Sequence, residues 1–274
     1  MTDYLCPTDL DEALHAMAGG RRILAGGTDL FAMGPQMRAG PVLDISALPS
    51  LRGITWGQGL RIGAAATWDQ IATASLPPSC RALQMAARMI GGRQVQNAGT
   101  IGGNLCNASP AADGVPPLLI LNAQVELASL QGVRHLPLHQ FLIAPRRTAL
   151  RPDEILVALH VADSDMRGAS RFLKLGARQN LVISIALVAV RAEVHAGQIV
   201  SAQVAVGSCS GVAQRLPGVE AALRGAPVAQ AAQRVHDADP GADLTPLDDI
   251  RATAAYRRTA ARTLICRALA QVLA

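Results

Sequence analysis

Two glycine-rich segments, residues 23–30 and 99–113, constrain this chain more than any other feature of its sequence. The first reads Ile-Leu-Ala-Gly-Gly-Thr-Asp-Leu, and the second contains Thr-Ile-Gly-Gly-Asn followed by Ser-Pro-Ala-Ala-Asp. Paired glycines leave backbone N–H groups unobstructed and adopt positive φ without strain. Successive N–H groups of this kind form a nest for an anion, and a diphosphate is a usual occupant. Both segments are therefore expected to approach a ligand closely.

Polar side chains accompany the glycines in both segments. They suit hydrogen bonds to phosphate, sugar hydroxyls and ring edges, and they are Thr28, Thr100, Asn104, Asn107 and Ser109. Neither segment is a P-loop, because no Lys-Ser/Thr pair follows, and neither contains Gly-x-Gly-x-x-Gly. Each segment taken alone also fits a tight turn between strands. Together, with these polar groups, the two segments favour a cradle for a dinucleotide.

Hydrophobic spacing in the first part of the chain predicts short helices that alternate with short strands. Thr8 is placed to cap the first helix, and Thr67 opens a capping box. Ser79 is placed to cap a further helix that runs to Ile90. Residues 93–113 are small and polar, so a loop is expected there.

The C-terminal part predicts a second unit of mixed α and β structure. Two β-rich runs, 181–194 and 198–208, are separated by a short turn and predict an antiparallel hairpin. A final helix is expected over 252–273, with Tyr256 on its apolar face and Arg257 off that face. The arginines of this helix either face solvent or contribute to docking of a partner.

Several classes of protein are excluded by what the sequence lacks. The five cysteines include no Cys-x-x-Cys pair, so neither an iron–sulfur cluster nor structural zinc is expected on this chain. Pro137 separates His135 from His139, so no metal site is expected there either. The mild net charge of +5 and the 3% of aromatic residues argue against nucleic-acid binding. Without a long apolar run or a secretory signal, no membrane span and a cytoplasmic location are expected.

Four further segments matter beside the two glycine-rich ones: Gln94–Gly99, Arg147–Leu156, Phe172–Arg178 and Ala255–Arg258. Together with Thr-Ile-Gly-Gly-Asn and Ser-Pro-Ala-Ala-Asp, they closely resemble the FAD-binding (medium) subunits of the xanthine dehydrogenase and carbon monoxide dehydrogenase family of molybdenum hydroxylases. The resemblance covers nearly the whole chain. Its most specific part is the second glycine-rich segment.

This resemblance implies an α+β fold in two domains. A two-lobed FAD-binding domain (PCMH-type) is expected over residues 1–165, with lobes of about 1–50 and 51–165 and the flavin between them. A smaller α+β C-terminal domain with an antiparallel sheet and helices is expected over 168–274. The polar stretch 163–170 marks the same boundary by its composition.

The resemblance also implies contacts to FAD, residue by residue. The first glycine-rich segment would wrap the diphosphate and the adjoining ribose, and the second would complete the cradle. Asn107, Ser109 and Asp113 would face the ribityl chain and the adenosine side. Ile90 stands where some relatives place an aromatic ring, and the Lys174 ammonium would lie near the polar edge of the flavin. The whole set is Leu24, Ala25, Gly26, Gly27, Thr28, Asp29, Leu30, Ile90, Thr100, Ile101, Gly102, Gly103, Asn104, Asn107, Ser109, Asp113, Leu156 and Lys174.

Alternative roles stay open for some of these residues. Asp113 also suits the N-cap of the helix that follows it, Lys174 also fits a solvated surface position, and Cys106 is expected to be buried packing. The family often has Arg where this chain has Gln96, so a charge contact is expected to be missing. The segment 176–183 corresponds to a loop that controls access to the flavin in relatives, but it has no aromatic residue here.

The function implied is electron transfer. Since this chain lacks cluster-binding cysteines and is too short for a molybdenum domain, both centres are expected on partners. These are a large subunit with molybdenum pterin and a small subunit with 2Fe-2S clusters, in a heterotrimer or a dimer of heterotrimers. Electrons from the clusters would pass through FAD to NAD, oxygen or another acceptor, with no catalytic acid, base or nucleophile on this chain. A free-standing flavoprotein oxidoreductase and a non-catalytic scaffold are the alternatives.

Overall fold

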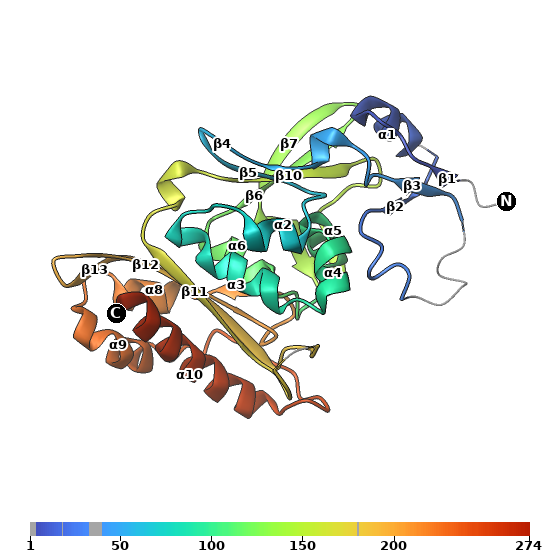
Figure 1. The fold of residues 1–274 in the computed structure, drawn as a ribbon. Helices are drawn as coiled ribbons and strands as arrows, with labels where there is room; N and C mark the ends of the chain where they lie inside the picture. Colours follow the sequence, from blue (N-terminus) through green and yellow to red (C-terminus); the bar gives the residue numbers. More distant parts are fainter. Residues whose placement is uncertain (1–3, 18, 33–39, 180) are drawn as a thin grey trace.

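Four β-sheets of two to five strands organise the computed structural model, which describes residues 4–17, 19–32, 40–179 and 181–274 (Figure 1). Helices pack on the three larger sheets, so the α+β class expected from the sequence is confirmed. No helix in these ranges is long and apolar enough to cross a membrane.

The chain begins with a small parallel sheet of order β1-β3-β2. Its elements are β1 (Tyr4–Leu5), α1 (Leu10–Met17), β2 (Arg22–Leu24) and β3 (Val42–Asp44). Helix α1 buries Ala13, Leu14 and Met17 in the core that it shares with this sheet. The Asp9 carboxylate accepts the N–H of Glu12 at 2.8 Å, so Asp9 holds the start of α1 and the expectation of a Thr8 cap is wrong.

A five-stranded antiparallel sheet of order β4-β5-β10-β6-β7 forms the second lobe. Its strands are β4 (Ile54–Gly57), β5 (Gly59–Gly63), β6 (Gln124–Ser129), β7 (Gly132–Pro137) and β10 (Ile155–Val161). The helices of this lobe are α2 (Trp68–Thr73), α3 (Arg81–Met89), α4 (Arg93–Ala98), α5 (Ile101–Asn107), α6 (Val115–Ile120) and α7 (Leu138–Phe141). A small hairpin, β8 (Leu142–Ala144) and β9 (Arg147–Thr148), follows α7.

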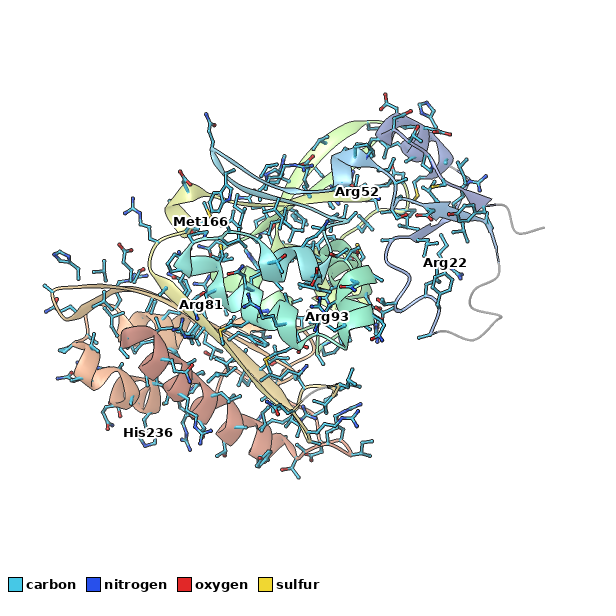
Figure 2. The ribbon with its side chains drawn as sticks, in the orientation of Figure 1. Arg22, Arg52, Arg81, Arg93, Met166 and His236 are labelled. Carbon is cyan, nitrogen blue, oxygen red and sulfur yellow. The ribbon has the colours of Figure 1, made fainter. Side chains whose placement is uncertain are left out.

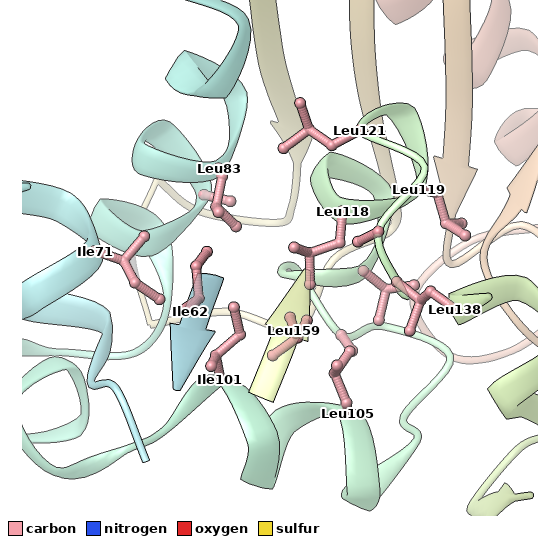
Figure 3. Close-up of a cluster of buried hydrophobic side chains, with 14 of the residues drawn as sticks. Ile62, Ile71, Leu83, Ile101, Leu105, Leu118, Leu119, Leu121, Leu138 and Leu159 are labelled. Atoms are coloured by element: carbon pink, nitrogen blue, oxygen red, sulfur yellow. The ribbon is translucent and has the colours of Figure 1, made fainter. Parts of the chain in front are cut away.

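The core of this lobe lies between one face of the sheet and the helices (Figure 3). Ile62 of β5 and Leu159 of β10 meet Ile101 and Leu105 of α5 and Leu118 of α6 there. These side chains are fully buried. Burial of such a side chain contributes about 1.5–3 kcal/mol, so the core fixes α5 firmly beside the sheet.

The expected loop over 93–113 is largely helical, because α4 and α5 lie within it. The Thr100 hydroxyl accepts the N–H of Gly103 at 3.1 Å and caps α5. Ile101 and Leu105, four positions apart, share the buried face of the helix. Tertiary packing of these two side chains outweighs the low helix propensity of the Gly-Gly pair.

The C-terminal part forms a four-stranded antiparallel sheet of order β11-β12-β13-β14. Its elements are β11 (Ala169–Leu175), β12 (Ala186–His195), β13 (Gln198–Gly207), β14 (Gln214–Arg215), α8 (Pro217–Leu223), α9 (Ala231–Asp237) and α10 (Ala254–Leu273). The predicted hairpin is present, although its first strand begins at Ala186 and not at 181.

Helix α10 lies along this sheet (Figure 1). Ala260, Leu264 and Ala268 are buried as expected, but two other residues of the helix depart from the expected pattern. Tyr256 is exposed, whereas Arg257 is buried. The Arg257 guanidinium donates to the carbonyls of Ile185 and Ser208 at 2.6 and 2.9 Å, and it pairs with Asp249 at 2.7 Å. This arginine is therefore structural and is not available for docking a partner.

Direct hydrogen bonds join the C-terminal sheet to the helices of the second lobe. Ser170 of β11 accepts the N–H of Ala82 at 2.8 Å, so the start of α3 is capped by Ser170. The expected cap, Ser79, is buried and its hydroxyl has no partner among the described residues. Arg191 of β12 donates to the carbonyl of Ile120 at 2.9 Å. The end of α6 is therefore held against the C-terminal sheet.

Candidate functional site

A cavity of about 720 Å³ lies where the two N-terminal lobes meet. Its volume is in the range of pockets that hold small molecules and cofactors. Arg22 of β2 contributes to its wall (Figure 2). Most of the residues expected to bind the cofactor line it: Leu24, Ala25, Gly26, Gly27, Thr28, Asp29, Leu30, Ile90, Thr100, Gly102, Gly103, Asn104, Asn107 and Leu156.

The first glycine-rich segment has the backbone that an anion nest requires. Gly27 has a φ of +71°, a conformation that favours glycine. A Cβ on Gly26 would overlap the carbonyl oxygen of Ala98, so this segment passes directly over the end of α4. The N–H groups of Gly26, Gly27 and Thr28 have no acceptor among the described residues. These donors are available to a ligand.

The second glycine-rich segment does not present the row of available N–H groups that the sequence predicted. The N–H groups of Ile101 and Gly102 donate to the carbonyls of Ala66 and Ala64 at 3.0 and 2.8 Å, and that of Gly103 donates to the Thr100 hydroxyl. These hydrogen bonds hold the start of α5 against the segment that follows β5. The segment therefore contributes side chains and a close wall to the cavity.

The two glycines of this segment have different tasks. A Cβ on Gly102 would lie 2.7 Å from the carbonyl oxygen of Ala64, so only glycine lets α5 dock here. A Cβ on Gly103 would meet only the Thr100 hydroxyl oxygen, at 3.0 Å. Since Gly103 lines the cavity, its missing side chain leaves room for a ligand.

Polar side chains connect the two segments at the cavity wall. The Asn107 carboxamide donates to the Asp29 carboxylate at 2.9 Å and accepts from Arg146. The carboxamide of Asn104 also lines the cavity, and its Oδ1 is buried with no partner among the described residues. A buried carbonyl oxygen without a partner costs about 1–3 kcal/mol.

One group of cavity residues outside the expected set comes from the segment that leads into β10. Arg151, Glu154 and Ile155 line the wall beside Leu156. Arg134 donates to both Glu154 oxygens, at 2.6 and 2.9 Å, and this contact holds the pKa of that carboxyl below its usual value. The segment Arg147–Leu156 carried the family resemblance in the sequence, and that was the signal available for these residues.

Asp113 and Lys174, both expected at the flavin, form a buried ion pair outside the cavity lining. Lys174 is the only lysine in the sequence, and its Nζ lies 2.5 Å from the Asp113 carboxylate. Ser184 donates to the other carboxylate oxygen at 2.7 Å. Burial raises the pKa of Asp113, while Lys174 and Ser184 oppose that rise. The solvated position considered for Lys174 is wrong, because its side chain is only 5% exposed.

The contacts of Asp113, Ile101, Ser109 and Cys106 complete the comparison with the roles expected from the sequence. Gly114 occupies the N-cap position of α6 without a side-chain cap, so Asp113 does not cap this helix. Ile101 is buried in the core, and the Ser109 hydroxyl accepts the N–H of Ala111 at 3.3 Å. Cys106 is exposed and lines the cavity, so the buried packing role expected for it is wrong.

The two departures from the family pattern, Gln96 and the loop over 176–183, each make contacts within the chain. The Gln96 amide donates to the carbonyls of Arg88 and Ile90 at 3.0 and 3.2 Å, so it holds the turn that places Ile90 on the cavity wall without a charge. In the loop over 176–183, Arg178 donates to the carbonyl of Leu181, whose φ is +50°. Asn180 of this loop lies outside the described residues.

Comparison with protein families gives two matches that together span most of the chain. The family described as "FAD binding domain in molybdopterin dehydrogenase" matches residues 1–162. The family described as "CO dehydrogenase flavoprotein C-terminal domain" matches residues 171–272.

Individual relatives agree with these matches. The putative xanthine dehydrogenase FAD-binding subunit of Escherichia coli (strain K12) is 30% identical over 277 residues, covering 97% of this chain and 94% of that relative. The nicotinate dehydrogenase FAD-subunit of Eubacterium barkeri is 38% identical over 194 residues, covering 67% and 66%. Among solved structures, a carbon monoxide dehydrogenase from Hydrogenophaga pseudoflava superposes with a TM-score of 0.90 at 27% identity, covering 99% of this chain and 96% of that chain.

Proposed function

Because this chain belongs to the family of FAD-binding domains of molybdopterin dehydrogenases, we propose that its cavity holds FAD and that it is the electron-transfer subunit of a multisubunit molybdenum hydroxylase. The observation that carries this proposal is the cavity between the lobes. It is bounded by both glycine-rich segments and offers the N–H groups of Gly26, Gly27 and Thr28 to an anion.

The residues of the cavity fit the parts of FAD. The diphosphate would lie against the first segment, where unobstructed N–H groups and the Thr28 hydroxyl supply donors. The close wall at Gly103 leaves space for it. The apolar side chains of Ile90 and Leu156 would pack against the flavin end. The remaining site residues expected from the sequence stay part of this proposal, Asp113 and Lys174 included.

FAD, when bound, supplies the ability to take up and release electrons, and the chain supplies its binding and its surroundings. No acid, base or nucleophile of this chain is assigned to substrate chemistry. The relatives are named as subunits of dehydrogenases, and both glycine-rich segments line the cavity. Neither observation favours a free-standing flavoprotein or a non-catalytic scaffold.

The partners in this proposal are a large subunit with molybdenum pterin and a small subunit with 2Fe-2S clusters. The assembly would be a heterotrimer or a dimer of heterotrimers in the cytoplasm, and the acceptor of the electrons would be NAD, oxygen or another oxidant. The substrate is selected by the large subunit. Co-purification from the source organism identifies these subunits, and the sequence of the large subunit indicates the class of substrate.

The proposal also divides the chain into a FAD-binding domain over 1–165, with lobes of about 1–50 and 51–165, and a C-terminal domain over 168–274. The short helical turn at Asp163–Asp165, which connects β10 with β11, supports this division, because it contains no buried residue. The two family matches end at residue 162 and begin at residue 171.

Reconstitution with FAD tests the cavity directly. The purified chain, incubated with FAD and desalted, is expected to keep one FAD per chain in its visible spectrum. Gly103→Val should abolish that retention, because the branched side chain would occupy the space of the diphosphate. Gly57→Val is the matched control, because nothing lies within 4 Å of a Cβ at Gly57. A colourless wild-type chain, or a Gly103→Val variant with full FAD content, would contradict the proposal.

A further inference from the structure

A second cluster of chemically capable side chains lies on the five-stranded sheet. Glu126 of β6, His135 of β7 and His160 of β10 bring one ligand atom each to within 4.8 Å of one another. His160 Nε2 lies 2.5 Å from Glu126 Oε2, and the two imidazole rings are 5.3 Å apart between centroids. None of the three residues lines the cavity between the lobes.

The register of the sheet creates this cluster from residues that are distant in the sequence. Glu126 pairs directly with His135 on one side and with Ala158 on the other. His160 is two positions beyond Ala158, so it lies diagonally across from Glu126 on the same face of the sheet. The neighbours Val125 and Leu127 point to the opposite face and belong to the core. The three side chains therefore share the face turned away from that core.

The chemistry of the cluster is that of a metal site. Two imidazoles and one carboxylate, with a water molecule in the fourth position, form a common ligand set for Zn²⁺. At bond lengths of about 2.0–2.2 Å, ligand atoms around one Zn²⁺ lie roughly 3–4 Å apart, so only small side-chain rotations are needed. The ligands stand on three adjacent hydrogen-bonded strands, and regular elements position ligands more accurately than loops do. His135 is exposed, which leaves a path for the ion.

The geometry points to a binding site for one divalent ion of the zinc class, with Glu126, His135 and His160 as its protein ligands. The ion would connect β7, β6 and β10 on the outer face of the sheet. Arg61 is the charged neighbour, with its Nε 3.9 Å from Glu126 Oε2. Arg61 pairs directly with His160 across β5 and β10, and its guanidinium also donates to the carbonyl of Ser50 at 2.8 Å. This site is separate from the FAD cavity and does not depend on the proposed function.

Calorimetric titration of the chain with ZnCl₂, after treatment with EDTA, tests the site. The wild type is expected to bind one Zn²⁺ per chain and to unfold at a higher temperature when Zn²⁺ is present. His135→Ala and His160→Ala should each weaken binding by about 100-fold or more, because even residues that only support a metal ligand contribute about 10–100-fold. Glu126→Gln, which keeps a hydrogen-bonding group beside His160, should also weaken it.

His139→Ala is the matched control, since His139 is exposed and lies outside the cluster. It should bind Zn²⁺ like the wild type, and all four variants should retain FAD like the wild type. Absence of Zn²⁺ binding in the wild type would overturn the inference. Equal affinity in the wild type, His135→Ala and His160→Ala would overturn it as well, because the ion would then bind elsewhere on the chain.

Discussion

Replacement of Lys174 by Met removes the cation from the most deeply buried ion pair among the described residues. The side chains of Lys174 and Asp113 are only 5% and 9% exposed, so solvent screens their attraction very little. Without Lys174, the Asp113 carboxylate keeps only the hydrogen bond from Ser184. Loss of one partner of a buried pair costs about 3–5 kcal/mol. A domain is typically stable by about 5–15 kcal/mol, so roughly a fifth of its stability or more is at stake.

The cost should depend on pH in a defined direction. Burial raises the pKa of Asp113 in the folded chain, and Lys174 opposes this rise, so its removal raises the pKa further. A carboxyl group with a raised folded pKa favours folding below its unfolded pKa of about 3.9, and that contribution is lost as the pH rises through the folded value. The deficit of Lys174→Met should therefore be small near pH 4 and reach its full size at neutral pH.

Urea unfolding of the wild type and Lys174→Met between pH 4 and pH 8 measures this deficit. The double variant Asp113→Asn with Lys174→Met should be more stable than Lys174→Met at neutral pH, because no unpaired charge remains buried. A deficit that is the same at both ends of the pH range would refute the reasoning. A neutral-pH deficit below about 1 kcal/mol would also refute it, since that is the size expected for an exposed pair.

Two further predictions concern contacts that hold the site in place. Ser170→Ala should lower the free energy of unfolding by about 0.5–2 kcal/mol, because α3 loses its cap. Ser79→Ala should change the free energy of unfolding little. Equal losses for the two variants in urea unfolding would show that Ser170 is not the cap. Arg134→Met should cost about 2–3 kcal/mol at neutral pH, a value reduced from that of a fully buried pair because Arg134 is 32% exposed. Because Arg134 lowers the pKa of Glu154 in the folded chain, the ion pair stabilises the fold above the unfolded pKa of Glu154. This stabilisation is lost as the pH falls through the folded pKa, so the loss of stability in Arg134→Met should shrink at acidic pH. A loss that grew on acidification would contradict this.

Local sequence signals predicted the parts of the fold that depend on neighbours in the chain. The capping box at Thr67 is present, because both of its hydrogen bonds lie within four residues. The hairpin of β12 and β13 is present for the same reason, since alternation and a short turn define it. The cavity wall at 23–30 followed from the glycines and from the resemblance of the whole segment to a family.

Contacts between distant residues could not be predicted in this way. Ser170 caps α3 through the N–H of Ala82, 88 residues earlier, whereas the stronger local signal is the serine next to the helix start. Glycines at 102 and 103 indicated a loop, whereas the buried faces of Ile101 and Leu105 determine a helix. His135 and His139 are close in sequence, but the sheet register brings His135 to His160. In each case the deciding contact forms only after the sheets assemble.

The central claim is that this chain carries the flavin of a larger enzyme while the metal centres belong to its partners. Purification of the native complex, separation of its subunits under mild conditions, and assay of each for FAD, iron and molybdenum tests this claim most directly. FAD should stay with this chain at one equivalent, and iron and molybdenum should stay with the other subunits. Recovery of this chain as a subunit without FAD, with the flavin on a partner, would contradict the claim.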